Sequence, residues 1–193
     1  MKICVYGASS SQLDKIYYEE AEKLGRLMGK NGHCLVFGGG REGLMGAVAR
    51  GVHSEGGEII GIAPKFFDEP GILYENCTEM LYTETMRERK QLMEDNSEAC
   101  IVLPGGIGTY EEFFEMLTLK QLGKSERAII LLNTNGYFAP VQALLEHTAE
   151  TKFMSENCMA LYTVVNTPEE VFRALETYVP RTGDLDRLEN YNK

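Results

Sequence analysis

A glycine-rich run, Pro-Gly-Gly-Ile-Gly-Thr-Tyr-Glu-Glu at residues 104–112, places the strongest constraint on how this chain folds. It follows an apolar segment at 99–103 that predicts a strand, and it precedes an amphipathic pattern that predicts a helix over 109–122. The first N–H groups of a helix have no partner within it, and the helix dipole makes that end partly positive. Glycines let the backbone approach an anion, and Thr109 adds a hydroxyl donor. The run therefore predicts a phosphate site, with a plain strand-to-helix turn as the alternative.

Short apolar runs alternate with longer periodic segments along the 193 residues. The predicted strands are 2–6, 34–37, 58–63, 99–103, 128–132 and 161–165, and the predicted helices are 17–28, 44–54, 85–97, 109–122, 138–151 and 168–178. Thr167 is the predicted N-cap of the last helix, with Glu170 at capping-box spacing. Alternating strands and helices predict an α/β fold with a doubly wound, mostly parallel sheet that has helices on both faces. We expect one catalytic domain over 1–180, a polar and partly disordered tail over 181–193, and an irregular loop over 64–83 at one edge of the site.

Charge and cysteine usage narrow the function classes. The net charge of −10, from 19 basic and 29 acidic residues, argues against nonspecific binding to nucleic acid or to an anionic membrane. The five cysteines include no CxxC pair, and Cys4, Cys34 and Cys100 fall in apolar strand-like runs, which predicts buried thiols in a reducing cytoplasm. No apolar stretch approaches membrane-spanning length. No His, Cys or carboxylate spacing indicates a metal site, and we expect neither a metal nor a cofactor.

A second glycine cluster, residues 38–46, follows the second predicted strand and satisfies the pattern GxGxxG. A dinucleotide site requires an acidic residue about twenty positions further on, and that position is apolar in this chain, which argues against a nicotinamide-dependent dehydrogenase. The first strand also ends in a small-residue turn, at 7–11. Because ligands of open α/β sheets bind outside the carboxyl ends of the strands, we expect all three turns to line one site.

A charged segment, Met-Arg-Glu-Arg-Lys at 86–90, precedes the strand that leads into residue 104, although such a run is commonly a solvated face. Together with the two glycine clusters, it resembles the Lonely Guy (LOG) family of cytokinin riboside 5'-monophosphate phosphoribohydrolases over residues 1–178. The resemblance implies a Rossmann-like fold, a homodimer, and hydrolysis of a nucleoside 5'-monophosphate, AMP or an N6-substituted AMP, to the free base and ribose 5-phosphate. By position it implies catalytic roles for Arg89 and Glu112 and substrate-binding roles for Gly105, Gly106, Gly108, Thr109, Lys90 and Glu111.

Two departures from the family pattern bear on the substrate. Arg87 stands where many members have His, and Ile107 stands where plant members often have Tyr, which makes plain AMP at least as strong a candidate as an N6-prenylated substrate.

Members of the family have also been labelled lysine decarboxylase-like. A pyridoxal-phosphate site leads one to expect a histidine directly before a lysine. None of the three histidines precedes a lysine, so these residues do not support that label. A non-catalytic nucleotide-binding or sensing protein is the alternative, but the presence of both Arg89 and Glu112 favours an enzyme.

The two adjacent glutamates are expected to differ in environment. At 100° per residue on a helix, Glu112 lies angularly between Met116 and Leu119, whereas Glu111 lies near Glu115. A carboxylate among apolar neighbours is costly unless it has a partner or a task. In N-glycosidic cleavage, such a group stabilises the oxocarbenium-like ribose or activates water. We therefore expect Glu112 to carry the chemistry and Glu111 to assist substrate contact.

Overall fold

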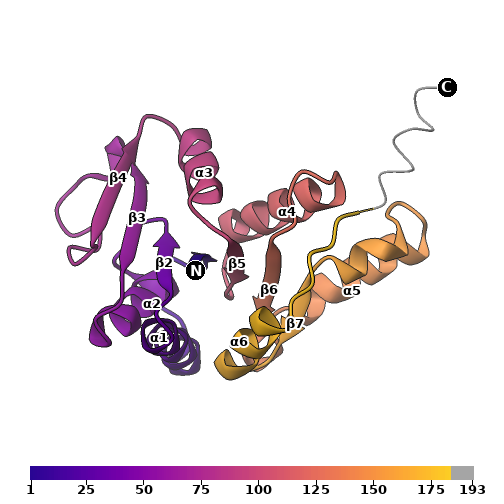
Figure 1. The fold of residues 1–193 in the computed structure, drawn as a ribbon, viewed down its shortest axis with the longest axis horizontal. Coiled ribbons are helices and arrows are strands. Elements are labelled where there is room, and N and C mark those ends of the chain that lie inside the picture. The colour runs from indigo at the N-terminus through magenta and orange to yellow at the C-terminus, as the bar shows by residue number, and fades with distance from the viewer. Residues whose placement is uncertain (184–193) are drawn as a thin grey trace.

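A computed structural model describes residues 1–183, in which a seven-stranded sheet lies between two layers of helices (Figure 1). The strands are β1 (Lys2–Tyr6), β2 (Cys34–Phe37), β3 (Ile59–Pro64), β4 (Glu79–Thr83), β5 (Ala99–Val102), β6 (Ala128–Leu132) and β7 (Thr163–Val165). The helices are α1 (Lys15–Lys30), α2 (Gly43–Ser54), α3 (Met86–Asp95), α4 (Ile107–Gln121), α5 (Ala139–Glu150) and α6 (Pro168–Glu176). Three short 3-10 turns, η1 (Lys65–Phe67), η2 (Thr134–Gly136) and η3 (Glu156–Ala160), complete the elements.

The strand order confirms the predicted doubly wound sheet. Neighbouring strands follow the order β4-β3-β2-β1-β5-β6-β7, and each of these pairings is parallel. The chain builds outward from β1 to β4 and then returns through α3 to β5 on the other side of β1. The switch in direction therefore falls between β1 and β5, where open α/β sheets bind their ligands.

Alternate side chains of each strand point to opposite faces of the sheet. On β1, Ile3 and Val5 pack in the cluster that contains α1, α2 and α6, while Cys4 and Tyr6 pack in the cluster that contains α3, α4 and α5. The three strand cysteines are buried as predicted, and burial raises the pKa of the Cys4 thiol to about 12. Among the described residues, no helix is long and apolar enough to cross a membrane.

The predicted loop over 64–83 is wrong at its carboxyl end, where β4 forms an edge strand paired with β3. The strand is half exposed and mixes polar and apolar side chains, so its sequence shows no clear strand period. The remainder of the segment is tied to the second glycine cluster, because Arg41 N donates to Ile72 O and Tyr74 N donates to Gly39 O, both at 2.9 Å.

Side-chain caps fix two helix starts. Thr167 accepts a hydrogen bond from Glu170 N in a capping box at α6, as predicted, and Thr85 and Glu88 form the same motif at α3. The second capping box matters for the site, since it sets where α3 begins and hence where its fourth residue, Arg89, points. The predicted tail, 181–193, lies outside the described residues from position 184 onward.

Candidate active site

The three predicted turns meet at the carboxyl edge of the sheet, because β2, β1 and β5 are neighbours. Ala8 N donates to Pro104 O at 3.0 Å, and Leu44 N donates to Ala8 O at 2.8 Å. Gly43 adopts a φ of +64°, and a Cβ at this position would lie 2.2 Å from Ala8 O. Glycine is therefore required there both by the backbone conformation and by the close approach of the first turn.

The start of α4 has open space beside two of its glycines, Gly106 and Gly108. The helix begins at Ile107 after Gly106 as N-cap, and Tyr110 N donates to Gly106 O at 3.1 Å. The amides ahead of this bond have no acceptor within the helix. A Cβ at Gly106 or Gly108 would meet no heavy atom within 4 Å, and neither glycine has a positive φ. Packing and backbone conformation thus do not require glycine at these two positions, whereas a closely bound anion would.

Gly105 and Thr109 form the inner side of the same turn. Thr109 is 4% exposed, and a Cβ at Gly105 would lie 2.1 Å from its Oγ1 atom. The threonine side chain therefore packs directly on Gly105. Sequence reasoning missed a further residue at this turn, Tyr137, whose hydroxyl donates to Gly105 O at 2.6 Å. Tyr137 belongs to no motif, because it lies between η2 and α5, far from residue 105 in sequence.

Arg89 of α3 and Glu112 of α4 form a buried ion pair. The distance from Nη1 of Arg89 to Oε1 of Glu112 is 3.4 Å, and the side chains are 9% and 11% exposed. The Nε atom of Arg89 donates to Ile62 O on β3 at 3.3 Å. A Cβ at Gly38 would lie 2.0 Å from Nη2 of Arg89, so the guanidinium fills the space above this glycine. The structure thus brings together the second glycine cluster, the charged segment and the glycine run.

The electrostatic environment of Glu112 differs from that of an ordinary surface glutamate. Burial raises its pKa to about 7, although the positive charge of Arg89 acts to lower it. Glu111 and Glu115 add to the increase, and Lys90 opposes it. A carboxyl group that titrates near neutral pH can both accept and release a proton under physiological conditions, as acid–base catalysis requires.

The other two residues predicted to bind substrate, Lys90 and Glu111, form an ion pair with one another. Nζ of Lys90 lies 2.5 Å from Glu111 and 3.0 Å from Glu115, in a hollow of about 460 Å³ between α3 and α4. Burial acts to lower the pKa of Lys90, but these hydrogen bonds outweigh it and raise the pKa. Glu111 is exposed while Glu112 is buried, which confirms the expected difference between them. Within residues 1–183, no three His, Cys, Asp or Glu side chains come together as a metal site.

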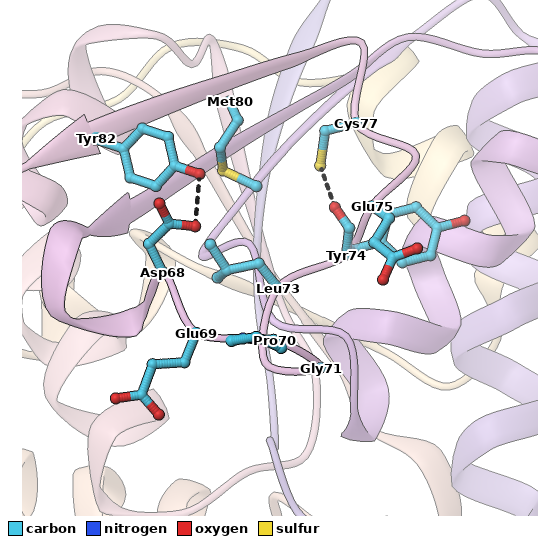
Figure 2. A pocket seen from close by; sticks show the side chains of 10 residues that line it. All are labelled: Asp68, Glu69, Pro70, Gly71, Leu73, Tyr74, Glu75, Cys77, Met80 and Tyr82. Carbon is cyan, nitrogen blue, oxygen red and sulfur yellow. Dashed lines mark hydrogen bonds between the residues drawn. The ribbon is translucent and has the colours of Figure 1, made fainter.

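A second hollow, of about 420 Å³, lies beside the second glycine cluster (Figure 2). A Cβ at Gly39 would lie 3.3 Å from Leu73 and 3.5 Å from Met80, two side chains of its lining. Figure 2 shows the hydroxyl of Tyr82 donating to Asp68 at one side of the hollow, a bond of 3.1 Å. The segment predicted as a loop therefore forms one wall of a cavity next to the site.

Comparison with known proteins assigns the chain to a family. Residues 45–175 match a family model described as "Possible lysine decarboxylase". A probable cytokinin riboside 5'-monophosphate phosphoribohydrolase of Oryza sativa subsp. japonica is 36% identical over 180 residues, which are 93% of this chain and 74% of that protein. A cytokinin riboside 5'-monophosphate phosphoribohydrolase of Arabidopsis thaliana is 33% identical over 184 residues, covering 95% and 86% of the two chains.

Solved structures of lower identity share the fold. A molybdenum cofactor carrier protein from Chlamydomonas reinhardtii has a TM-score of 0.69 at 20% identity, covering 91% of this chain and 95% of the other. DNA processing protein A from Helicobacter pylori has a TM-score of 0.57 at 13% identity, with 91% and 80% covered. At these identities the likeness extends to the Rossmann-like fold alone. The sequence relatives and the family model together show that the chain belongs to the LOG family of enzymes.

Proposed function

We propose that the protein hydrolyses the N-glycosidic bond of a nucleoside 5'-monophosphate, AMP or an N6-substituted AMP, to the free base and ribose 5-phosphate. One observation carries the proposal: Glu112, which forms a buried ion pair with Arg89 of α3, lies on the helix whose amino terminus is open and lined by glycines. A site that merely binds an anion needs only the glycine turn and would not require this ion pair. A buried carboxylate with a pKa near 7 points to chemistry beside that anion.

Substrate binding follows from the geometry of α4. The 5'-phosphate binds the first amides of the helix, with Gly106 and Gly108 leaving room for it and Gly105 and Thr109 shaping the turn from within. Glu112 lies six residues after Gly106, which corresponds to about 9 Å along the helix axis. The phosphate-binding amides and Glu112 belong to one rigid helix, so the distance between them is fixed. The bound phosphate therefore positions the ribose against the carboxylate.

Glu112 and Arg89 divide the chemistry. The glycosidic bond breaks with its electron pair passing to the base nitrogen, and the ribose acquires oxocarbenium character that ionised Glu112 stabilises. A water molecule attacks the anomeric carbon and gives its proton to Glu112, and the departing base takes up a proton, so that Glu112 can return to its ionised form by releasing its own. Arg89 keeps a fraction of Glu112 ionised by charge pairing and supports the departing base. Lys90 and Glu111 assist substrate binding as a pair at the adjoining surface.

The rim of the site favours AMP as at least an equal substrate. Ile107 is 85% exposed as the first residue of α4, within the glycine run, and Arg87 lines the hollow between α3 and α4. Both differ from the residues common in the family, so the surroundings of the base differ too.

The decisive experiment incubates the protein with AMP and with N6-isopentenyl-AMP and quantifies free base and ribose 5-phosphate by chromatography. We expect release from at least one of them, and far slower release from adenosine. Glu112→Gln should lose on the order of 100-fold or more in kcat, whereas Glu111→Gln should chiefly raise KM. Binding of monophosphates without release of base would instead favour a nucleotide-binding or sensing protein.

We also infer a homodimer, acting in the cytoplasm. The family resemblance is the ground for the dimer, and exposed apolar side chains such as Phe66, Phe67 and Met86 are available for a contact. The cysteine usage, with no CxxC pair, is the ground for the cytoplasm. Light scattering should give twice the chain mass of 21.6 kDa. A mass of one chain across working concentrations would overturn the dimer.

A further inference from the structure

The phosphate turn is held by a tyrosine hydroxyl that arrives from another part of the fold. Tyr137 donates to Gly105 O at 2.6 Å and accepts a hydrogen bond from Tyr110 Oη at 3.1 Å. Tyr110 lies on α4 itself, whereas Tyr137 lies between β6 and α5. The glycine turn is therefore fixed from the neighbouring strand connection as well as from its own helix.

The contacted carbonyl belongs to the most adjustable peptide of the turn. In a trans peptide the C=O of Gly105 and the N–H of Gly106 point in opposite directions. Glycine on both sides of this peptide leaves its plane unusually free to rotate. Gly105 is buried and Gly106 is exposed, so a hydrogen bond that holds the carbonyl inward turns the Gly106 N–H outward. On that side the structure is open, because a Cβ added at Gly106 would meet no heavy atom within 4 Å.

We propose that Tyr137 is a positioning residue for the substrate phosphate, acting through the Gly105–Gly106 peptide. The inference rests on the proposed function, since it concerns the anion site of the same reaction. Tyr137 does not itself touch the reacting atoms. Its hydroxyl holds the peptide plane in the orientation that presents the Gly106 amide to the phosphate.

The surroundings of Tyr137 suit a fixed support. Its ring packs edge-to-face on Tyr17 at 6.2 Å and on Phe138 at 5.2 Å between ring centroids. The preceding turn is closed by Gly136 at a φ of +72° and by Asn133, whose side chain accepts from Phe138 N at 2.7 Å. Burial, followed by the bond from Tyr110, raises the pKa of Tyr137 to about 12, so the phenol remains a donor at working pH.

The variant Tyr137→Phe isolates the hydroxyl, because the ring contacts remain. The buried Gly105 carbonyl then loses this donor, and its peptide can rotate and carry the Gly106 amide away from the phosphate. We expect the Kd for ribose 5-phosphate, measured by calorimetry, to rise about five- to tenfold. The KM for AMP should rise by a similar factor while kcat stays close to that of the wild type. Turnover of adenosine, which has no phosphate, should not change.

Tyr162→Phe provides the matched control. Its hydroxyl lies 3.8 Å from the sulfur of Met159, among buried side chains on the α4 face of the sheet. This variant should match the wild type in Kd and in the ratio of AMP to adenosine turnover. A Tyr137→Phe protein that binds ribose 5-phosphate like the wild type, or that loses AMP and adenosine turnover equally, would overturn the positioning role.

The wild type separates this proposal from the proposed function. If it binds ribose 5-phosphate but cleaves no nucleotide, the hydrolytic function fails, and the comparison of Kd values still decides the role of Tyr137. If it does not bind ribose 5-phosphate, the phosphate site is wrong and both proposals fall.

Discussion

Glu112 should make the folded protein less stable as the pH rises, and Glu112→Gln should remove this loss. Burial raises the pKa of Glu112 from 4.5 to about 7, so between these values the folded state holds the proton more often than the unfolded state does. The free energy of unfolding therefore falls as the pH rises through this window. The shift corresponds to about 3 kcal/mol as an upper limit. Glutamine resembles the protonated side chain and keeps an oxygen for Arg89.

The assay compares melting temperatures of the wild type and Glu112→Gln at pH 4, 6 and 8 by circular dichroism. The variant should melt up to about 6–12 °C higher at pH 8 and coincide with the wild type at pH 4. Glu111→Gln removes an exposed carboxylate that adds to the raised pKa of Glu112 less than burial does, so this variant should keep most of the pH dependence. Equal or lower melting of Glu112→Gln at pH 8 would refute the idea that ionised Glu112 is held at a cost in free energy.

Three further outcomes follow from the same geometry. The kcat/KM for AMP should fall below about pH 7 as Glu112 becomes protonated, and a pH-rate profile that is flat from pH 5 to 8 would exclude Glu112 as the titrating group. Gly38→Ala should displace the guanidinium of Arg89 and lower kcat by on the order of 100-fold in a protein that still folds by circular dichroism; unchanged steady-state kinetics would contradict the contact. Gly108→Ala should raise the stability of α4 by up to about 1 kcal/mol in chemical denaturation while raising KM for AMP about tenfold, and an unaltered KM would remove Gly108 from the phosphate site.

Much of the fold could be predicted because its signals are local. The strands of the sheet interior are short apolar runs, and the capping box at Thr167 is readable within four residues. β4 was not predicted because an edge strand buries little apolar surface and shows no clear alternating pattern. Its pairing with β3 in the folded protein, and not its own sequence pattern, makes it a strand. The tie between Gly39 and Tyr74 is likewise a long-range contact that no local pattern contains.

The candidate site divides in the same way. The glycine run predicted an anion site at the start of a helix, and the helical period predicted that Glu112 is buried and Glu111 exposed. The pairing of Lys90 with Glu111 depends on how α3 packs beside α4, and the reach of Tyr137 to Gly105 depends on the order of β5 and β6. Such contacts cross elements that are far apart in the chain, so they appear once the sheet is assembled.

The arginine of α3 explains why three separated motifs occur together in one chain. A guanidinium is planar, so its position is set when two of its edges are fixed. Ile62 O accepts from Nε of Arg89, and the absent side chain of Gly38 leaves the space that Nη2 occupies, which directs Nη1 to Glu112. A larger residue at 38 would turn the guanidinium away and leave Glu112 buried without its partner, at a cost that is large for an unpaired charge. The glycine after β2, the arginine of α3 and the glutamate of α4 therefore form one structural requirement, and each is of use to the site because the other two are present.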